Sequence, residues 1–235
     1  MTSLTDLIKN DILYVINPQE YQREELISLL NSHPEIRFVS LAGADLTGNS
    51  TDERIPIRAF FEDIEEFLNG SVQTDGSSVV LPGIATLNDG KLDLVADTNS
   101  LWFVDYNYEN IDYETGRPVG TLRIPSFLMH GNKFVDSRSI LIRAVERFKS
   151  TLMEIFRNCP AICKEFGFNS GDIDEILLTS ATELEFWVMT PNDKADVEAL
   201  TASQELQESY WKRTKGVVRT SLEQSLILMD KYNLK

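Results

Sequence analysis

The hydrophobic pattern of the chain changes near residue 134, and this change limits the folds that the chain can adopt. Before that point, short strand-like runs such as LDLVA (92–96) and LWFVDYN (101–107) are separated by Gly, Pro, Asn and Asp. After it, the apolar residues of 136–156 recur at helical spacing, which predicts a long helix with one core-facing side and Asp136 as its N-cap. The sequence therefore predicts an α+β protein with a domain boundary close to Phe134, dividing it into residues 1–134 and 135–235.

The remaining elements follow from the same patterns. Leucines at helical spacing predict a helix over 21–30, and the apolar run that follows in EIRFVSLAGADLTGN predicts a strand that leads into a turn. A single short amphipathic helix is expected after Pro56, closed by Gly70 as a left-handed cap. A strand is expected over 177–189, and a last helix over about 203–232.

The balance of charge excludes several classes of partner. The chain has 37 acidic and 22 basic residues and a formal charge of −15, which repels both a phosphate backbone and an anionic membrane surface. No segment supplies the roughly 20 apolar residues that a membrane span needs, and the start of the chain lacks the pattern of a secretory signal. We therefore expect a cytoplasmic protein with no nucleic-acid partner and no membrane partner.

The scarcity of histidine and cysteine limits the chemistry. With two histidines and two cysteines, a histidine-rich metal site is excluded within this sequence, and nucleophilic triads have few candidates. Cys159 and Cys163 lack further zinc ligands at suitable spacing, so we expect a structural or incidental role for them, since reduced thiols commonly pack as small hydrophobes. Any chemistry should depend on carboxylates.

Two glutamates stand out in the segment SATELEFWVM. On a strand, Glu183 and Glu185 would point to the same face about 6.6 Å apart, a geometry that suits one divalent cation for each carboxylate. Spacing alone favours the simpler interpretation, the solvated face of an amphipathic strand. The apolar neighbours in LEFWVM favour burial instead, where unpaired carboxylates are costly.

A second candidate site is the segment TDGSSVVLPG, which places Asp75 and Ser78 between two apolar runs. Asp-Gly followed by two hydroxyl residues is ordinary turn chemistry, because Gly accepts a positive φ and Asp or Ser can bond the local backbone. A functional role would require a ligand at this turn.

Taken in order along the chain, these segments resemble the glutamine synthetase family. The resemblance is carried by FVSLAGADLTGN, DGSS, LDLVADTNSLWFVDY, DSRSILIRAVERF and TELEFWV, which together span most of the chain. It implies a small β-grasp-like amino-terminal domain followed by the first helices and strand of the catalytic domain. Ser137 and Leu184 stand where the family often has proline.

The resemblance also implies site residues and ligands. It assigns Glu183 and Glu185 to two Mg²⁺ or Mn²⁺ ions at an ATP site. It assigns Asp75 a catalytic and substrate-binding role, in which the loop enters the active site of a neighbouring subunit, binds ammonium and favours its deprotonation, with Ser78 as a further substrate contact. The partners implied are glutamate, ammonium and ATP, in a homo-oligomer whose active sites lie between subunits.

The leading hypothesis is that these residues form the amino-terminal part of a longer glutamine synthetase, which joins ammonium to glutamate through a γ-glutamyl phosphate. We expect the other metal-ligating glutamates, the metal-binding histidine and the substrate-binding arginines of that family to lie beyond Lys235, and the 235 residues alone to be inactive. Two alternatives remain: a γ-glutamyl ligase that uses another amine, and a non-catalytic relative that acts as an interaction module.

Overall fold

The computed structural model describes residues 12–51, 53–79, 90–183 and 216–234. The chain divides into two compact units, Met1–Leu177 and Leu178–Lys235. Phe134, where the sequence predicts a domain boundary, lies inside the first unit, and that boundary stays a prediction.

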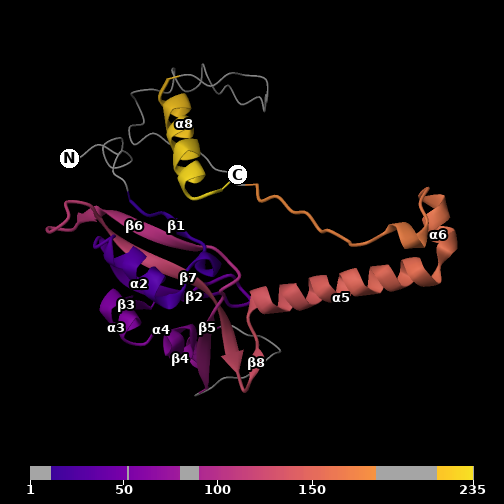
Figure 1. Ribbon diagram of the computed structural model, residues 1–235, viewed down its shortest axis with the longest axis horizontal. Coiled ribbons are helices and arrows are strands. Elements are labelled where there is room, and N and C mark those ends of the chain that lie inside the picture. Colours follow the sequence, from indigo (N-terminus) through magenta and orange to yellow (C-terminus); the bar gives the residue numbers. More distant parts are fainter. Residues whose placement is uncertain (1–11, 52, 80–89, 184–215, 235) are drawn as a thin grey trace. The chain divides into compact units, whose positions relative to one another are not determined.

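The first unit combines a mixed sheet with helices, so the α+β class predicted from the sequence is confirmed. Its central strand, β7 (Pro118–His130), pairs in parallel with β2 (Ile36–Gly43) and antiparallel with β6 (Trp102–Ile111) (Figure 1). The other strands are β1 (Val15–Ile16), β3 (Arg54–Pro56), β4 (Asn69–Asp75), β5 (Lys91–Ala96) and β8 (Lys133–Phe134). The strands β1, β6, β7, β2 and β3 lie in that order, β5 and β8 also pair with β7, and β4 pairs with β5.

The core lies on the sheet face where alternate residues of β7 are buried. Leu122, Ile124 and Leu128 are fully buried, as expected for strand residues two apart that point to one face. Trp102 of β6 is also fully buried. Helix α2 (Arg23–Asn31), which follows the short 3₁₀ turn η1 (Pro18–Glu20), adds two buried leucines and confirms the helix predicted there.

Two helices follow Pro56 where the sequence predicts one, so the prediction of a single helix is wrong. They are α3 (Ile57–Glu62) and α4 (Ile64–Leu68), which lie beside the sheet (Figure 1). The break falls at Asp63, whose φ of −148° and ψ of 76° are not helical. Its carboxylate accepts a hydrogen bond from Glu66 N at 3.1 Å, because a short polar side chain can compete with the helical backbone and cap a new helix.

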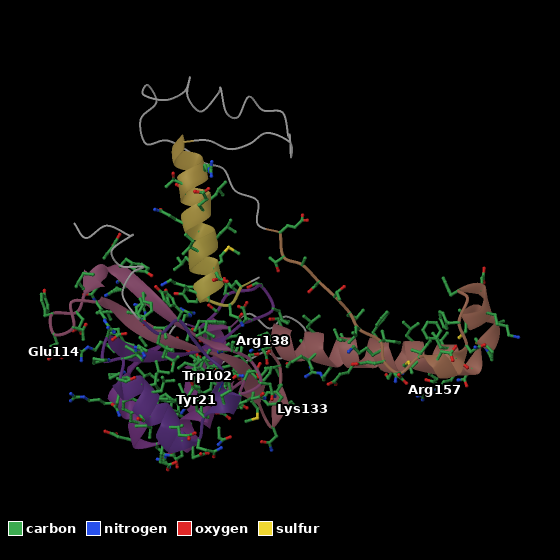
Figure 2. All side chains as sticks on the ribbon, turned by 45° about the horizontal axis from the view of Figure 1, so that its top comes forward. Tyr21, Trp102, Glu114, Lys133, Arg138 and Arg157 are labelled. Carbon is green, nitrogen blue, oxygen red and sulfur yellow. The ribbon has the colours of Figure 1, made fainter. Side chains whose placement is uncertain are left out.

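The long helix predicted after Asp136 is present as α5 (Ser137–Asn158), and the predicted N-cap is confirmed. Figure 2 labels Arg138 at its start and Arg157 near its end. The expectation that α5 buries a core face is not met among the described residues: Ser139 is its one buried residue, and Leu141 and Phe148 are 63% and 50% exposed. The next helix, α6 (Pro160–Glu165), buries Cys163, and Cys159 is exposed.

The strand predicted over 177–189 is absent from its described part. After η3 (Ser170–Asp172), residues 173–183 adopt no regular secondary structure, and 184–189 lie outside the described residues. A strand needs a partner for its backbone groups, and no strand pairing is found for 177–183. Helix α8 (Gly216–Lys231) occupies part of the last predicted helix.

Within the described part of the chain, none of the helices combines the length and the apolar character needed to cross a bilayer.

Candidate functional site

The loop that carries Asp75 joins the end of β4 to a short 3₁₀ turn, η2 (Gly76–Ser78). Asp75 Oδ1 accepts a hydrogen bond from Ser77 N at 2.9 Å, and Oδ2 accepts one from Ser77 Oγ at 2.7 Å. These bonds, the backbone one foremost, hold the pKa of Asp75 below its ordinary value. Asp75 is exposed, so the loop presents a charged carboxylate to solvent at neutral pH.

Asp75 and Ser78 line one open depression of about 420 Å³. Its lining also includes Asp45, which precedes a turn after β2, and Glu53, which precedes β3. The described lining contains three carboxylates and no lysine or arginine. Like charges gathered on one concave surface attract cations and repel anions, so the depression favours a positively charged ligand.

Asp45 is held in place by its own turn. Its Oδ1 accepts hydrogen bonds from Thr47 N at 2.9 Å, Thr47 Oγ1 at 2.8 Å and Asn49 N at 3.0 Å. The residue is 3% exposed, and its position is therefore fixed before any ligand arrives. The sequence places it in the segment GADLTGN, where a turn is predicted, but the segment gives no sign that the turn faces the Asp75 loop.

The floor of the depression is closely packed. Gly43 at the end of β2 and Leu128 of β7 both line it. A Cβ atom added at Gly43 would lie 2.6 Å from Leu128 Cδ2, closer than real Cβ atoms approach. Leu128 thus occupies the space that a side chain at position 43 would need, so a larger residue there would have to displace the Leu128 side chain.

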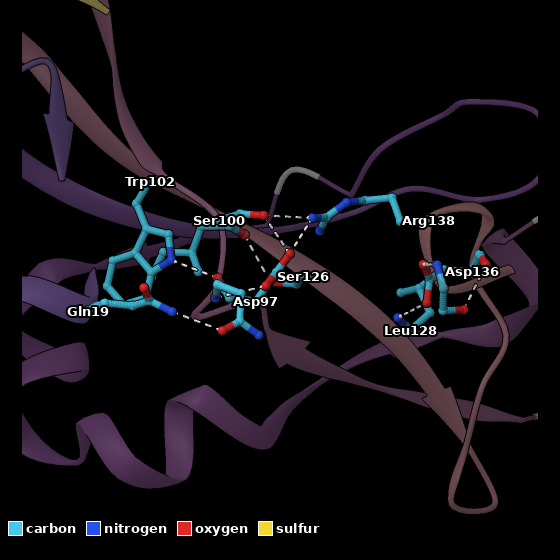
Figure 3. A network of polar contacts seen from close by, with 11 residues as sticks. Gln19, Asp97, Ser100, Trp102, Ser126, Leu128, Asp136 and Arg138 are labelled. Atoms are coloured by element: carbon cyan, nitrogen blue, oxygen red, sulfur yellow. Dashed lines mark hydrogen bonds and ion pairs between the residues drawn. The ribbon is translucent and has the colours of Figure 1, made fainter. Parts of the chain in front are cut away.

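A second aspartate, Asp97, lies in a buried polar network at the turn between β5 and β6 (Figure 3). Its carboxylate accepts hydrogen bonds from Asn99 N at 3.0 Å, from Ser100 Oγ at 2.6 Å and from the Arg138 guanidinium of α5. Burial raises the pKa of Asp97, but these hydrogen bonds outweigh burial and keep the pKa below its ordinary value. Arg138 also lies over the Phe127 ring, 5.0 Å from its centroid.

Another charged cluster secures the turn between β6 and β7. Arg37 Nε donates to Asp112 Oδ2 at 2.5 Å, and its Nη2 donates to Glu114 Oε2 at 2.6 Å. The hydrogen bond from Arg37 holds the pKa of Asp112 far below its usual range, against the effect of burial. Asp112 also accepts backbone hydrogen bonds within its own turn, so we interpret this cluster as structural.

Of the two predicted metal ligands, the structure describes one. Glu183 is exposed and lies in a segment without regular secondary structure, and Glu185 lies outside the described residues. In the residues whose positions are given, no group of three or more His, Cys, Asp or Glu side chains is arranged to hold a metal ion. The metal pair thus stays a prediction from the sequence. Of the four predicted site residues, the structure brings together Asp75 and Ser78.

Comparison with known proteins gives little further information. No family model matches the chain, and no curated protein matches it. Among solved structures, the chain is similar to GmaS, a glutamine synthetase-like enzyme, in a complex with ADP. The TM-score is 0.36 and the identity 16%, over 52% of this chain and 26% of the GmaS chain. The chain thus matches about a quarter of that protein's length, and a similarity at this level is too low to assign a family or an activity.

Proposed function

We propose that this chain carries the amine-binding part of a γ-glutamyl ligase of the glutamine synthetase type. The observation that carries the proposal is the acidic depression, in which Asp75 and Ser78 lie with Asp45 and Glu53 and without a basic residue in the described lining. The sequence resemblance assigns ammonium binding to this same Asp75 loop. The proposal includes the finer expectations of that resemblance: a β-grasp-like domain, a homo-oligomer with shared sites, and glutamate and ATP as substrates.

Asp75 acts in this proposal as a binding group for a cation. Its lowered pKa keeps the carboxylate charged at neutral pH, and each oxygen retains lone pairs besides those used by Ser77. The same lowered pKa makes Asp75 a weak proton acceptor, so its contribution is to attract and orient the protonated amine. Binding should be lost only as the pH falls through the lowered pKa, below the ordinary value of 3.8.

Glu183 and Glu185 are the residues proposed to hold Mg²⁺ or Mn²⁺. The exposed carboxylate of Glu183 is chemically suitable for a hard cation, although two carboxylates alone supply only part of the ligands that a pair of ions requires. When bound, a divalent ion neutralises charge on a transferring phosphoryl group.

The size of the depression favours a second candidate, a ligase that uses an organic amine. A volume of about 420 Å³ falls in the range of small-molecule sites. A water-sized ion such as ammonium occupies only about 30 Å³. An alkylamine would occupy more of the depression and place its alkyl group near Val79.

An activity assay tests both candidates. The product of the natural gene is incubated with ATP, Mg²⁺, glutamate and a series of amines from ammonium to alkylamines, and γ-glutamyl products are measured. We expect Asp75→Asn to raise the apparent KM for the amine. Asp63→Asn is the matched control, because Asp63 is also an N-cap aspartate but lies outside the depression. Equal amine dependence in Asp75→Asn and wild type would contradict the proposed role.

The metal ligands need their own test. In the same gene product, Glu185→Ala and Glu183→Ala should each abolish product formation and leave the fold intact, because these carboxylates are proposed to bind ions, not to pack. Activity within a few-fold of wild type at saturating Mg²⁺ would remove the ligand role.

A further inference from the structure

The N-cap of α5 is hydrogen-bonded to a residue that lines the acidic depression. Asp136 is fully buried, and its two carboxylate oxygens serve different elements. Oδ1 accepts from Ser139 N at 2.8 Å and caps α5, whereas Oδ2 accepts from Leu128 N of β7 at 3.0 Å (Figure 3). A cap requires only the first bond, and the second joins the cap residue to β7.

The additional bond fixes a residue of the depression floor. Leu128 is held on both sides of its backbone, since its N–H donates to Asp136 and its C=O accepts from Val135 N at 2.8 Å. Its side chain fills the space beside Gly43. A shift of Leu128 would therefore change the floor directly, because close-packed atoms transmit displacement.

Ser137, the first residue of α5, bonds to the segment beside Gly43. Ser137 donates to Ala44 O from its Oγ at 3.3 Å and from its N at 3.4 Å. Ala44 lies between Gly43 and Asp45, which both line the depression. The N-cap and the first residue of α5 thus bond to Leu128 of β7 and to Ala44, which directly follows β2.

We propose that Asp136 is a positioning residue for the amine subsite, which it shapes through Leu128 without contacting the amine. This inference rests on the proposed function of the Asp75 loop. It differs from a purely structural cap because the capping bond and the bond to β7 use different oxygens. The two tasks can therefore be separated by substitution.

Asp136→Ser separates them. Serine is as good an N-cap as aspartate, but its single short hydroxyl cannot also reach Leu128 N. The matched control is Asp63→Ser at α4, where the carboxylate caps a helix outside the depression. We expect Asp136→Ser to keep the helicity of α5, to speed hydrogen exchange at the Leu128 amide, and to weaken methylammonium binding by about tenfold. The control should change none of these.

The readouts distinguish failure of this inference from failure of the proposed function. Methylammonium is titrated into the 235-residue chain, with NaCl at equal ionic strength as the reference, and amide signals of Gly43, Asp45 and Asp75 are followed by NMR. If Asp136→Ser does not fold, Asp136→Asn replaces it, since its one oxygen can serve one of the two donors. Unchanged methylammonium affinity in a folded variant overturns the positioning role. If wild type and Asp75→Asn respond alike to methylammonium, the proposed function fails. The role of Asp136 then depends on the spectra of Asp136→Ser alone, and an unmoved Gly43 signal with unchanged hydrogen exchange at Leu128 would overturn that role.

Discussion

Asp75 and Asp97 occupy two turns with nearly the same local chemistry. Each carboxylate accepts a backbone N–H from the residue two positions later, at 2.9 Å for Asp75 and 3.0 Å for Asp97. Each also accepts a nearby serine hydroxyl, and in both cases the pKa lies below its ordinary value. Local sequence thus gives both residues the same turn and the same charge.

Their tertiary surroundings differ. Asp97 is 5% exposed and receives the Arg138 guanidinium from a helix 41 positions along the chain. Asp75 is exposed in an acidic depression, and no lysine or arginine is among the described residues that line it. A paired, buried aspartate anchors structure, and an exposed one among like charges can attract a cation. Whether a basic residue from elsewhere in the fold pairs with the aspartate therefore decides the role of that aspartate.

The largest effect should come from breaking the buried pair. Arg138→Ala leaves the Asp97 carboxylate without its cation, and we expect a loss of about 2–3 kcal/mol in the free energy of unfolding. Urea denaturation measures it. Arg143→Ala on the same helix is the control, because Arg143 is exposed and donates to the Phe134 carbonyl. Equal stabilities of the two variants would show that the Asp97 pair is not an anchor.

The pH dependence of the free energy of unfolding tests whether the charge of Asp97 stabilises the fold. The pKa of Asp97 is lower in the folded protein than its ordinary 3.8, so its contribution is fully present above the unfolded-state value and is lost as the pH falls through the folded-state value. Asp97→Asn cannot titrate. We expect the stability difference between wild type and Asp97→Asn to be constant near neutrality and to shrink below about pH 4. A difference independent of pH would exclude a role for the charge.

Sequence patterns predict local structural elements better than they predict the roles of single residues. Asp136 as an N-cap, the helix over 21–30 and the α+β class follow from local spacing and are confirmed. The pairing of Asp97 with Arg138 could not be predicted, because it depends on where β5 and α5 meet in the fold. The approach of Asp45 to Asp75 depends in the same way on β2 and β4.

The wrong predictions have different physical causes. The sequence predicts one helix through Asp63, because the apolar stripe continues across the break, but the cap at Asp63 ends the first helix. The alternation of side chains over 177–189 predicts a strand. A strand also requires a partner for its backbone groups, and the described part of this segment lacks one. The core face expected for α5 is a true apolar stripe, but among the described residues its side chains remain largely exposed.

The smallest effect on stability should come from Asp75. Its hydrogen bonds stay within its own exposed turn, so Asp75→Asn should leave the midpoint of thermal unfolding unchanged. Differential scanning calorimetry of Asp75→Asn beside Asp97→Asn makes the comparison direct. A clear loss of stability in Asp75→Asn would place this residue with the anchors.

A methylammonium titration of the 235-residue chain, followed by NMR, tests whether the Asp75 depression binds an amine. We predict saturable shifts of the Asp75, Ser77 and Ser78 amide signals, which persist in Asp63→Asn and disappear in Asp75→Asn. Shifts that are no larger than those caused by NaCl at equal ionic strength, or that persist in Asp75→Asn, would contradict the claim.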